Sequence, residues 1–318
     1  MDRVTTSDGV AVAVHDLGGD GPPLVLAHAT GFNGRVWAPM VDRLKARFRC
    51  LAVDHRGHGD SGAPPGTDFG WRGLGQDVLA VVDGLGIEAP FGIGHSAGGT
   101  ALLLAEEARP GTFRAIYCFE PVMVPVDPPL GPDPDSWLAA AARKRRDVFA
   151  SRVEAHEHYA SKPPLDTLDG ACLRAYVDHG FEDLPDGTVR LKCRPEHEAL
   201  MAEMATEHDC FTRLDRIACP VMLARGDATE GYARSTEPLL SRLRPMAQVQ
   251  VLAGLGHLGP MQAPDEVGHS ASEFLTGISS VGKARSRELL RDQHDGLALG
   301  DDAVGSGDKG FAIVDPEM

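Results

Sequence analysis

Short apolar runs alternate with stretches of helical periodicity along most of this 318-residue chain. Buried strands separated by helices form a parallel β-sheet with helices packed on its two faces. The alternation therefore predicts an α/β fold with a mostly parallel central sheet. The runs expected as buried strands are 24–27, 50–53, 91–93, 115–119, 221–224 and 249–252, and the alternating run 10–14 is expected as an early antiparallel strand.

Helical spacing of apolar residues predicts the elements between these strands. It is present in the stretches 37–44 and 78–85 and in a last helix that is expected to end at Gly277. The stretch 100–105 is apolar on nearly every side, which indicates a helix in the centre of the fold.

The alternation stops between residues 122 and 209. Five prolines lie between positions 125 and 134, and helical stretches follow at 136–159, 166–179 and 195–208. We expect a helical cap over this segment, inserted between the two parts of a sheet-containing core, 1–121 and 210–278. Residues 279–318 are rich in Gly, Asp and Ser, which predicts a mostly disordered tail.

Composition argues against several classes of protein. A formal net charge of −15 disfavours a nucleic-acid-binding surface, and the one dense basic run, 143–146, is expected as a solvated helix face. No apolar run approaches the roughly 20 residues of a membrane span, and a signal-peptide pattern is lacking at the N-terminus. Six cysteines without C-x-x-C spacing predict buried free thiols and a cytoplasmic location.

A candidate nucleophile lies in the segment 94–98, which reads Gly-His-Ser-Ala-Gly between an expected strand and an expected helix. A serine on such a sharp turn points its hydroxyl out of the sheet edge, and flanking glycines avoid a Cβ clash. Because a serine hydroxyl is a weak nucleophile at neutral pH, Ser96 needs a base that takes its proton.

Position selects the base among 13 histidines. His257 lies in a glycine-rich segment, 254–260, just after the last expected strand, where it can reach the edge that carries Ser96. The negative charge of a tetrahedral intermediate also needs two backbone N–H donors. We expect them from Ala97, at the start of the helix, and from Thr30, in the loop 28–32 after the first parallel strand.

Four segments in order make the chain resemble the α/β-hydrolase family over residues 8 to 277. They are the loop 28–32, the segment 54–61 (Asp-His-Arg-Gly-His-Gly-Asp-Ser), the elbow 94–98 and the histidine segment 254–260. The resemblance implies hydrolysis through a serine acyl-enzyme. The chain departs from the family pattern at Ala29, where a glycine is usual, and Gly31 is expected to make the turn instead.

The acid that orients the histidine stays open between two places in the family pattern. In many members it follows the strand that here ends at Ala224, but the matching residue is the uncharged Thr229, flanked by Asp227 and Glu230. In a subset that includes haloalkane dehalogenases and some esterases it follows the strand after the nucleophile helix, where this chain has Glu120. Both places lie at the carboxyl ends of neighbouring parallel strands. Glu120 is the first candidate, and Glu230 and Asp227 are the alternatives.

Other interpretations of these residues explain less. The glycines at 92 and 94 also fit a dinucleotide fingerprint, which would leave His257 and the loop 28–32 without a role. The pairs His55/His58 and His156/His158 have spacings that metal ligands can adopt, but the first lies in a turn that the family uses structurally. Positions i and i+2 of a helix, as in the second pair, do not face each other. We therefore expect neither a cofactor nor a metal.

The sequence thus predicts a serine hydrolase that cleaves carboxylic esters of small to medium-sized molecules with Ser96, His257 and Glu120. A lactonase, a thioesterase and a cofactor-free perhydrolase would use the same three groups. A non-catalytic receptor for a small molecule would use the same capped cavity. Neither the natural substrate nor the oligomeric state follows from the sequence, and no nucleic-acid or membrane partner is expected.

Overall fold

The computed structural model describes residues 1–124 and 130–278, and for 230–235 it describes the backbone only. By its internal contacts the chain divides into residues 1–278 and residues 279–318. The expected disordered tail, 279–318, lies outside the described residues.

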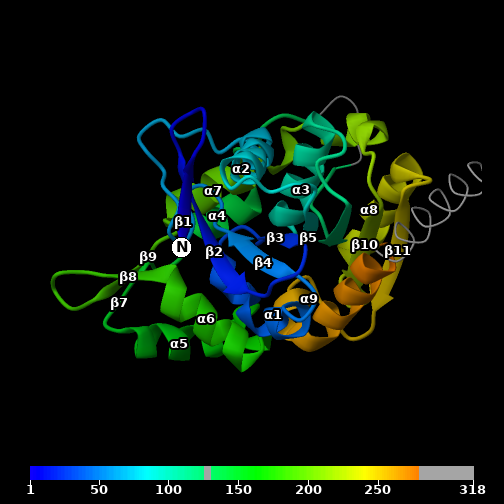
Figure 1. Ribbon diagram of the computed structural model, residues 1–318. Coiled ribbons are helices and arrows are strands. Elements are labelled where there is room, and N and C mark those ends of the chain that lie inside the picture. The colour runs from blue at the N-terminus through cyan, green and yellow to red at the C-terminus, as the bar shows by residue number, and fades with distance from the viewer. Residues whose placement is uncertain (125–129, 279–318) are drawn as a thin grey trace, which may run out of the picture. The chain divides into compact units, whose positions relative to one another are not determined.

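An eight-stranded sheet runs through the middle of the unit 1–278 (Figure 1), in the order β1-β2-β4-β3-β5-β6-β10-β11. Strands β1 and β2 are antiparallel to their neighbours, and all the other pairs are parallel. The predicted α/β fold class is therefore confirmed. The strands are β1 (Asp2–Thr5), β2 (Ala11–Gly18), β3 (Pro23–Ala27), β4 (Arg49–Val53), β5 (Phe91–His95), β6 (Ala115–Phe119), β10 (Val221–Gly226) and β11 (Ala247–Leu252).

Two strands at the edges of the sheet differ from the expectation. Strand β11 was expected to be buried, but Val249 and Val251 are exposed. An edge strand has a neighbour on one side only, so apolar residues alone do not show that it is covered. Strand β1 was not predicted at all, because its residues Asp2–Thr5 are mostly polar and exposed.

Helices cover both faces of the sheet (Figure 1). One face carries α1 (Ala38–Leu44), which the short helix η1 (Gly34–Trp37) precedes, and the last described helix, 264–278. The other face carries α2 (Trp71–Gly84), α3 (Ala97–Ala108), η4 (Cys210–Arg216) and α8 (Glu230–Leu243). Helix α3 is buried along nearly its whole length, as its apolar sequence predicts.

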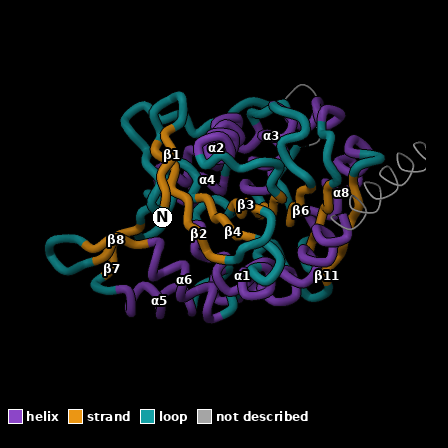
Figure 2. The backbone as a smooth tube through the Cα atoms, viewed as in Figure 1, coloured by secondary structure: helices purple, strands orange, loops and turns teal. Residues whose placement is uncertain are grey.

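The segment 122–209, which follows β6 and precedes η4, contains both helices and strands among its described residues, and we call it the insertion. Its elements are α4 (Trp137–Arg143), β7 (Val148–Phe149), α5 (Arg152–Ala160), η2 (Leu165–Thr167), α6 (Gly170–Gly180), β8 (Phe181–Asp183), β9 (Val189–Leu191), α7 (Pro195–Glu203) and η3 (Met204–Thr206). Its three strands form a small sheet in the order β7-β9-β8. Figure 2 shows β7 and β8 projecting beside α5 and α6.

The stretch 136–159 was expected to be helical throughout, but the structure has two helices with strand β7 between them. Helix α5 begins anew because the Ser151 hydroxyl accepts a hydrogen bond from the backbone N–H of Glu154. Strands of two or three residues are too short to give a sequence period, which is why the pattern predicted none here.

The basic run 143–146 is not the uniformly solvated face that its sequence suggests. Arg143 forms ion pairs with two glutamates of the insertion, but Arg145 is largely buried and contacts Glu198 and the hydroxyl of Tyr176. The expectation fails at Arg145 because the run lies where α4 ends, so helical periodicity does not set the direction of that side chain.

The segment 54–61 forms a tightly braced turn after β4. Arg56 is buried and makes a two-pronged ion pair with the buried carboxylate of Asp77 on α2. The Ser61 hydroxyl donates to the carbonyl of Asp54 and accepts from the backbone N–H of Ala13. Ordered side chains therefore fix the loop that lies next to the candidate site.

All six cysteines are buried free thiols, as their spacing predicted. Within residues 1–124 and 130–278, no helix combines the length and hydropathy that a bilayer crossing requires.

Candidate active site

Ser96 lies at the sharp turn between strand β5 and helix α3. Its backbone has φ 54° and ψ −120°, a strained conformation that costs on the order of 1–3 kcal/mol and is typical of a nucleophile on such a turn. A Cβ at Gly94 would lie 2.5 Å from the Cα of Gly99, and one at Gly98 would lie 2.1 Å from the carbonyl oxygen of Ala27. Only glycine fits at these two positions, which explains the elbow sequence.

His257 lies in the turn between β11 and α9 (Gly259–Gln262), at the same edge of the sheet. Its Nε2 is 3.1 Å from the Oγ of Ser96. Ser96 is buried, whereas the imidazole is 34% exposed. The structure thus brings together the two side chains that the sequence singled out as nucleophile and base.

Glu120 follows strand β6 directly, and its side chain is fully buried. One carboxylate oxygen lies 2.7 Å from the Nδ1 of His257, and the other accepts a hydrogen bond of 3.0 Å from the backbone N–H of Gly226. The Glu120 carboxylate is therefore fixed at both oxygens, by the imidazole of His257 at one and by the backbone of Gly226 at the other. Of the three acids considered, Glu120 has the position that an orienting group requires.

The two alternative acids lie near the end of β10. Asp227 is exposed and accepts a hydrogen bond from the backbone N–H of Gly254. Glu230 is the first residue of α8, and its side chain lies outside the described part of the chain.

The loop 28–32 follows β3 and turns at Gly31, which has a φ of 82°. Ala29 has an ordinary backbone, so the expected relocation of the turn to Gly31 is what the structure contains. Two N–H groups of the loop are already bonded: that of Phe32 to the carbonyl of Ala29, and that of Gly31 to the Nε2 of His58.

The two expected oxyanion donors are the backbone N–H groups of Thr30, in the loop 28–32, and of Ala97, in the elbow 94–98. The Thr30 hydroxyl donates to the sulfur of Met201 at 3.3 Å. The two bonded N–H groups of the loop belong to Gly31 and Phe32, not to Thr30. Ala97 is the first residue of α3, a position whose N–H has no partner within a helix. Both backbone groups stay candidates for this role.

Three buried histidines, one of them the first residue of the loop 28–32, fix this loop through hydrogen bonds. The Nδ1 of His28 donates to the carbonyl of Ala29, and its Nε2 accepts from the backbone N–H of His55. The Nε2 of His55 donates back to the carbonyl of His28, while His58 accepts from Gly31. Burial lowers the pKa of all three, that of His55 to about 3, so they are neutral at physiological pH.

One group of potential metal ligands occurs among the described residues: His15, Asp54 and Asp60, whose ligand atoms lie within 4.8 Å of one another. The carboxylate of Asp54 already contacts His15 and accepts from two backbone N–H groups, and Asp60 pairs with Lys192. These acids are satisfied without a cation, so the group is explained as part of the braced turn 54–61.

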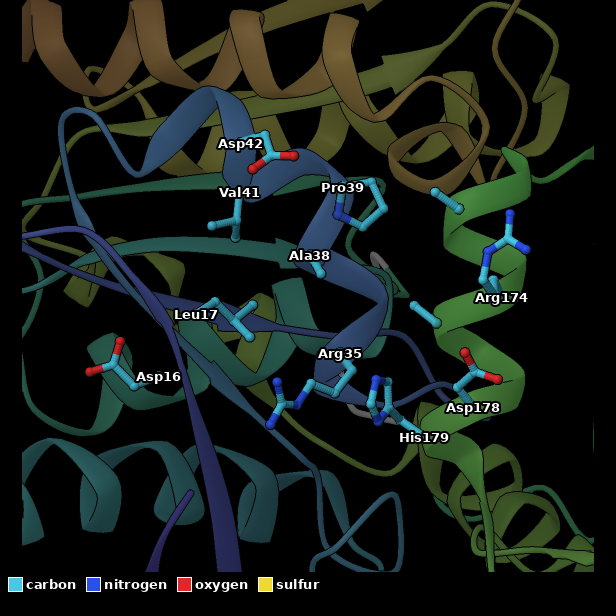
Figure 3. Close-up of a pocket in the computed structure, with 12 residues that line it drawn as sticks. Asp16, Leu17, Arg35, Ala38, Pro39, Val41, Asp42, Arg174, Asp178 and His179 are labelled. Carbon is cyan, nitrogen blue, oxygen red and sulfur yellow. The ribbon is translucent and has the colours of Figure 1, made fainter.

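An open groove of about 570 Å³ lies between α1 and α6 (Figure 3). Charged side chains of both signs line it, among them Arg35, Arg174 and Asp178. None of its lining residues is a candidate site residue, and none is a serine, threonine or cysteine. The groove therefore does not mark the candidate active site, which is located by the contact between Ser96 and His257.

A sequence profile described as "Alpha/beta hydrolase family" matches residues 24–269, most of the chain. The chain belongs to the alpha/beta hydrolase family. The putative carbamate hydrolase RutD of Caulobacter segnis is 35% identical to this hydrolase over 281 residues, which cover 86% of this chain and 98% of RutD. The 2-(acetamidomethylene)succinate hydrolase of Mesorhizobium japonicum is 24% identical, over 81% of this chain and 89% of that enzyme.

The fold of this hydrolase matches solved structures of the family. The crystal structure of E-2-(acetamidomethylene)succinate hydrolase superposes with a TM-score of 0.72 at 22% identity, over 86% of this chain and 98% of the other. Together with family membership, the named relatives support hydrolase activity on a small-molecule substrate.

Sequence reasoning missed two contributions to the site of this hydrolase. His58 was interpreted only as part of a structural loop, yet it bonds directly to the loop 28–32. His95 was passed over, although its ring bonds to the backbone of His257. The place of His95 directly before the candidate nucleophile was the one signal that could have drawn attention to it.

The buried histidines predict that this hydrolase loses stability in weak acid. Below about pH 6.5 the unfolded chain binds protons at His28, His55 and His95, whereas burial keeps these residues neutral in the folded protein. Since stability rises with pH wherever the unfolded state binds more protons, each histidine contributes a slope of up to about 1.4 kcal/mol per pH unit between its two pKa values. Urea denaturation at about pH 7.5 and about pH 5.5 measures the difference. An unchanged free energy of unfolding would contradict the neutral assignment.

Proposed function

We propose that this hydrolase cleaves carboxylic esters of small to medium-sized substrates through an acyl-enzyme on Ser96. The observation that carries the proposal is the unbroken line of contacts from the Ser96 hydroxyl through the His257 imidazole to the Glu120 carboxylate, at 3.1 Å and 2.7 Å. A serine, a base and an orienting acid in this geometry perform acyl transfer on several unrelated folds.

In the first half of the proposed reaction, the Oγ of Ser96 attacks the ester carbonyl carbon and the Nε2 of His257 takes the hydroxyl proton. The carbonyl oxygen becomes an oxyanion, which the backbone N–H groups of Thr30 and Ala97 stabilise. Removing one such donor typically costs about 100–1000-fold in rate. The C–O bond then breaks, and His257 returns the proton to the departing alcohol, which leaves an ester on Ser96.

In the second half, His257 takes a proton from water, and the resulting hydroxide attacks the acyl carbon. The tetrahedral intermediate collapses, the proton returns to the Oγ of Ser96, and the carboxylic acid leaves. Glu120 keeps the proton of the imidazole on Nδ1, so that Nε2 is free to accept, and it stabilises the cation that forms in both halves.

We further propose that residues 122–209 form the cap of this site. Its helix α7 supplies Met201, whose sulfur contacts Thr30 and whose carbonyl accepts from the indole N–H of Trp71. The insertion therefore contacts the loop 28–32, which carries a proposed oxyanion donor. The shape of the acyl pocket would depend on how α7 packs there. The buried free thiols support our expectation of a reducing, cytoplasmic location.

A second candidate activity is hydrolysis of an acyl C–N bond, because two relatives of this chain are named for a carbamate and an acetamido compound. The same three side chains would serve, with an amine in place of the alcohol as leaving group. A lactonase, a thioesterase and a perhydrolase also stay possible within this mechanism.

The test is a panel of chromogenic esters of increasing acyl length, followed by lactones, thioesters and amides with matched acyl groups. We expect saturable turnover of esters with an optimum at short to medium acyl chains, and lower kcat/KM for the matched amides. Faster turnover of the amides would replace the ester assignment by the second candidate. Binding without turnover of any substrate would indicate a receptor and would contradict both.

A further inference from the structure

We propose that His95 is a positioning residue that holds the backbone of His257 in register with the nucleophile. The inference deepens the proposed function and rests on it. His95 is the last residue of strand β5 and directly precedes Ser96. Its Nε2 lies 2.7 Å from the carbonyl oxygen of His257, and the centroids of the two imidazole rings are 5.0 Å apart.

The contact assigns the proton of His95. A carbonyl oxygen only accepts hydrogen bonds, so the Nε2 of His95 must carry the hydrogen. The side chain is fully buried, and burial holds its pKa well below the ordinary value, which keeps the ring neutral. The Nδ1 is then an acceptor, and it has no hydrogen-bond partner among the described residues. The ring therefore works through one nitrogen, the one that faces the histidine turn.

The turn that carries His257 needs such an anchor. Residues 253–258 are neither helix nor strand, so no regular backbone ladder fixes them. The carbonyl of Leu255 accepts from the N–H of Ala228, and the N–H of Gly256 donates to the side chain of Gln262. Together with the bond from the N–H of Gly254 to Asp227, these bonds tie the turn to the end of β10 and to α9. The bond from His95 ties it to β5, the strand that ends at the nucleophile.

This link matters because the distance between base and nucleophile must be held closely. An error of about 1 Å in the placement of a catalytic group can cost about 100-fold in rate. Glu120 fixes the far nitrogen of the His257 ring, and the bond from His95 fixes the backbone to which that ring is attached. If the bond from His95 is removed, the imidazole can still form the pair with Glu120 while its ring moves away from Ser96.

Glutamine and asparagine separate this role from plain packing. The amide nitrogen of glutamine can reach the place of the histidine Nε2, whereas that of asparagine reaches only the place of Nδ1. We expect His95→Gln to keep kcat within about threefold of the unmodified enzyme and His95→Asn to lower it by roughly 10–100-fold, with little change in KM in either. The rate of inactivation by a fluorophosphonate should follow the same order, because it reports the reactivity of Ser96 without substrate specificity.

The two variants are compared at equal folded fraction, with thermal midpoints measured alongside kcat, KM and the inactivation rate. Equal kcat for His95→Asn and His95→Gln would overturn the inference, whether both are active or both are impaired, because the position of the donor would not matter. If Ser96→Ala abolishes turnover while His95→Asn matches the unmodified enzyme, ester hydrolysis stands and the role of His95 falls. Unchanged turnover of Ser96→Ala would instead remove the proposed function on which this inference rests.

Discussion

Replacement of Ser96 by alanine is expected to lower kcat for a short acyl ester by about 10⁶-fold, the size of the loss seen when a serine hydrolase loses its nucleophile. The Oγ is the only atom removed, and it is the atom that lies 3.1 Å from the Nε2 of His257. Without it no acyl-enzyme can form, and the remaining groups can only polarise the substrate. Steady-state kinetics with a chromogenic ester measure the change.

Stability provides the control for this variant. Ser96 is buried, but among the described residues its hydroxyl hydrogen-bonds only to the partly exposed imidazole of His257, and alanine is smaller. The positive φ of the elbow strains alanine and serine alike. We therefore expect the free energy of unfolding to change by less than about 1 kcal/mol. Retention of full activity by a folded Ser96→Ala protein would show that the nucleophile lies elsewhere.

Replacement of Glu120 by glutamine is expected to lower kcat by about 10⁴-fold, as in a serine protease whose orienting acid is made an amide. The structure explains why the amide would be harmful. The backbone N–H of Gly226 needs an acceptor, so the amide oxygen should turn toward it and the NH₂ group toward the Nδ1 of His257. The imidazole would then carry its proton on Nε2, where it cannot accept the proton of Ser96.

The matched controls are Asp227→Asn and Glu230→Gln, which remove a charge near the same edge of the sheet. We expect both to keep kcat within a few-fold, since only Glu120 is assigned to His257. A large loss in Glu230→Gln with a small one in Glu120→Gln would transfer the orienting role to α8. Small and equal effects in all three variants would mean that none of these acids orients the base.

The sequence was a good guide to the central sheet for a physical reason. A strand buried between helices on two faces must be apolar along its length, so β3, β4, β5 and β6 are visible as runs. That constraint is absent at the edges, where β1 is polar and β11 is exposed. It is also absent in the insertion, where β7 has two residues and the burial of Arg145 depends on partners distant in sequence.

In the candidate site, too, some residues could be predicted from a local sequence pattern and others could not. Ser96 and its glycines obey a local steric rule that five consecutive residues reveal, and the turn with His257 has its own glycine-rich sequence. The choice among Glu120, Asp227 and Glu230 depended on the distance between two loops, which no local pattern contains. The support that His58 and His95 give to the site is also a tertiary contact, and so it became apparent only in the structure.

The most direct test of the account is to locate the nucleophile chemically. The enzyme is treated with a fluorophosphonate, digested, and the modified peptide is identified by mass spectrometry. We predict one phosphonyl adduct, on the Oγ of Ser96, with no labelling of Ser96→Ala and strongly slowed labelling of Glu120→Gln. An adduct on another residue of an active enzyme, or no adduct while ester turnover continues, would contradict the assignment of Ser96 and His257 as nucleophile and base.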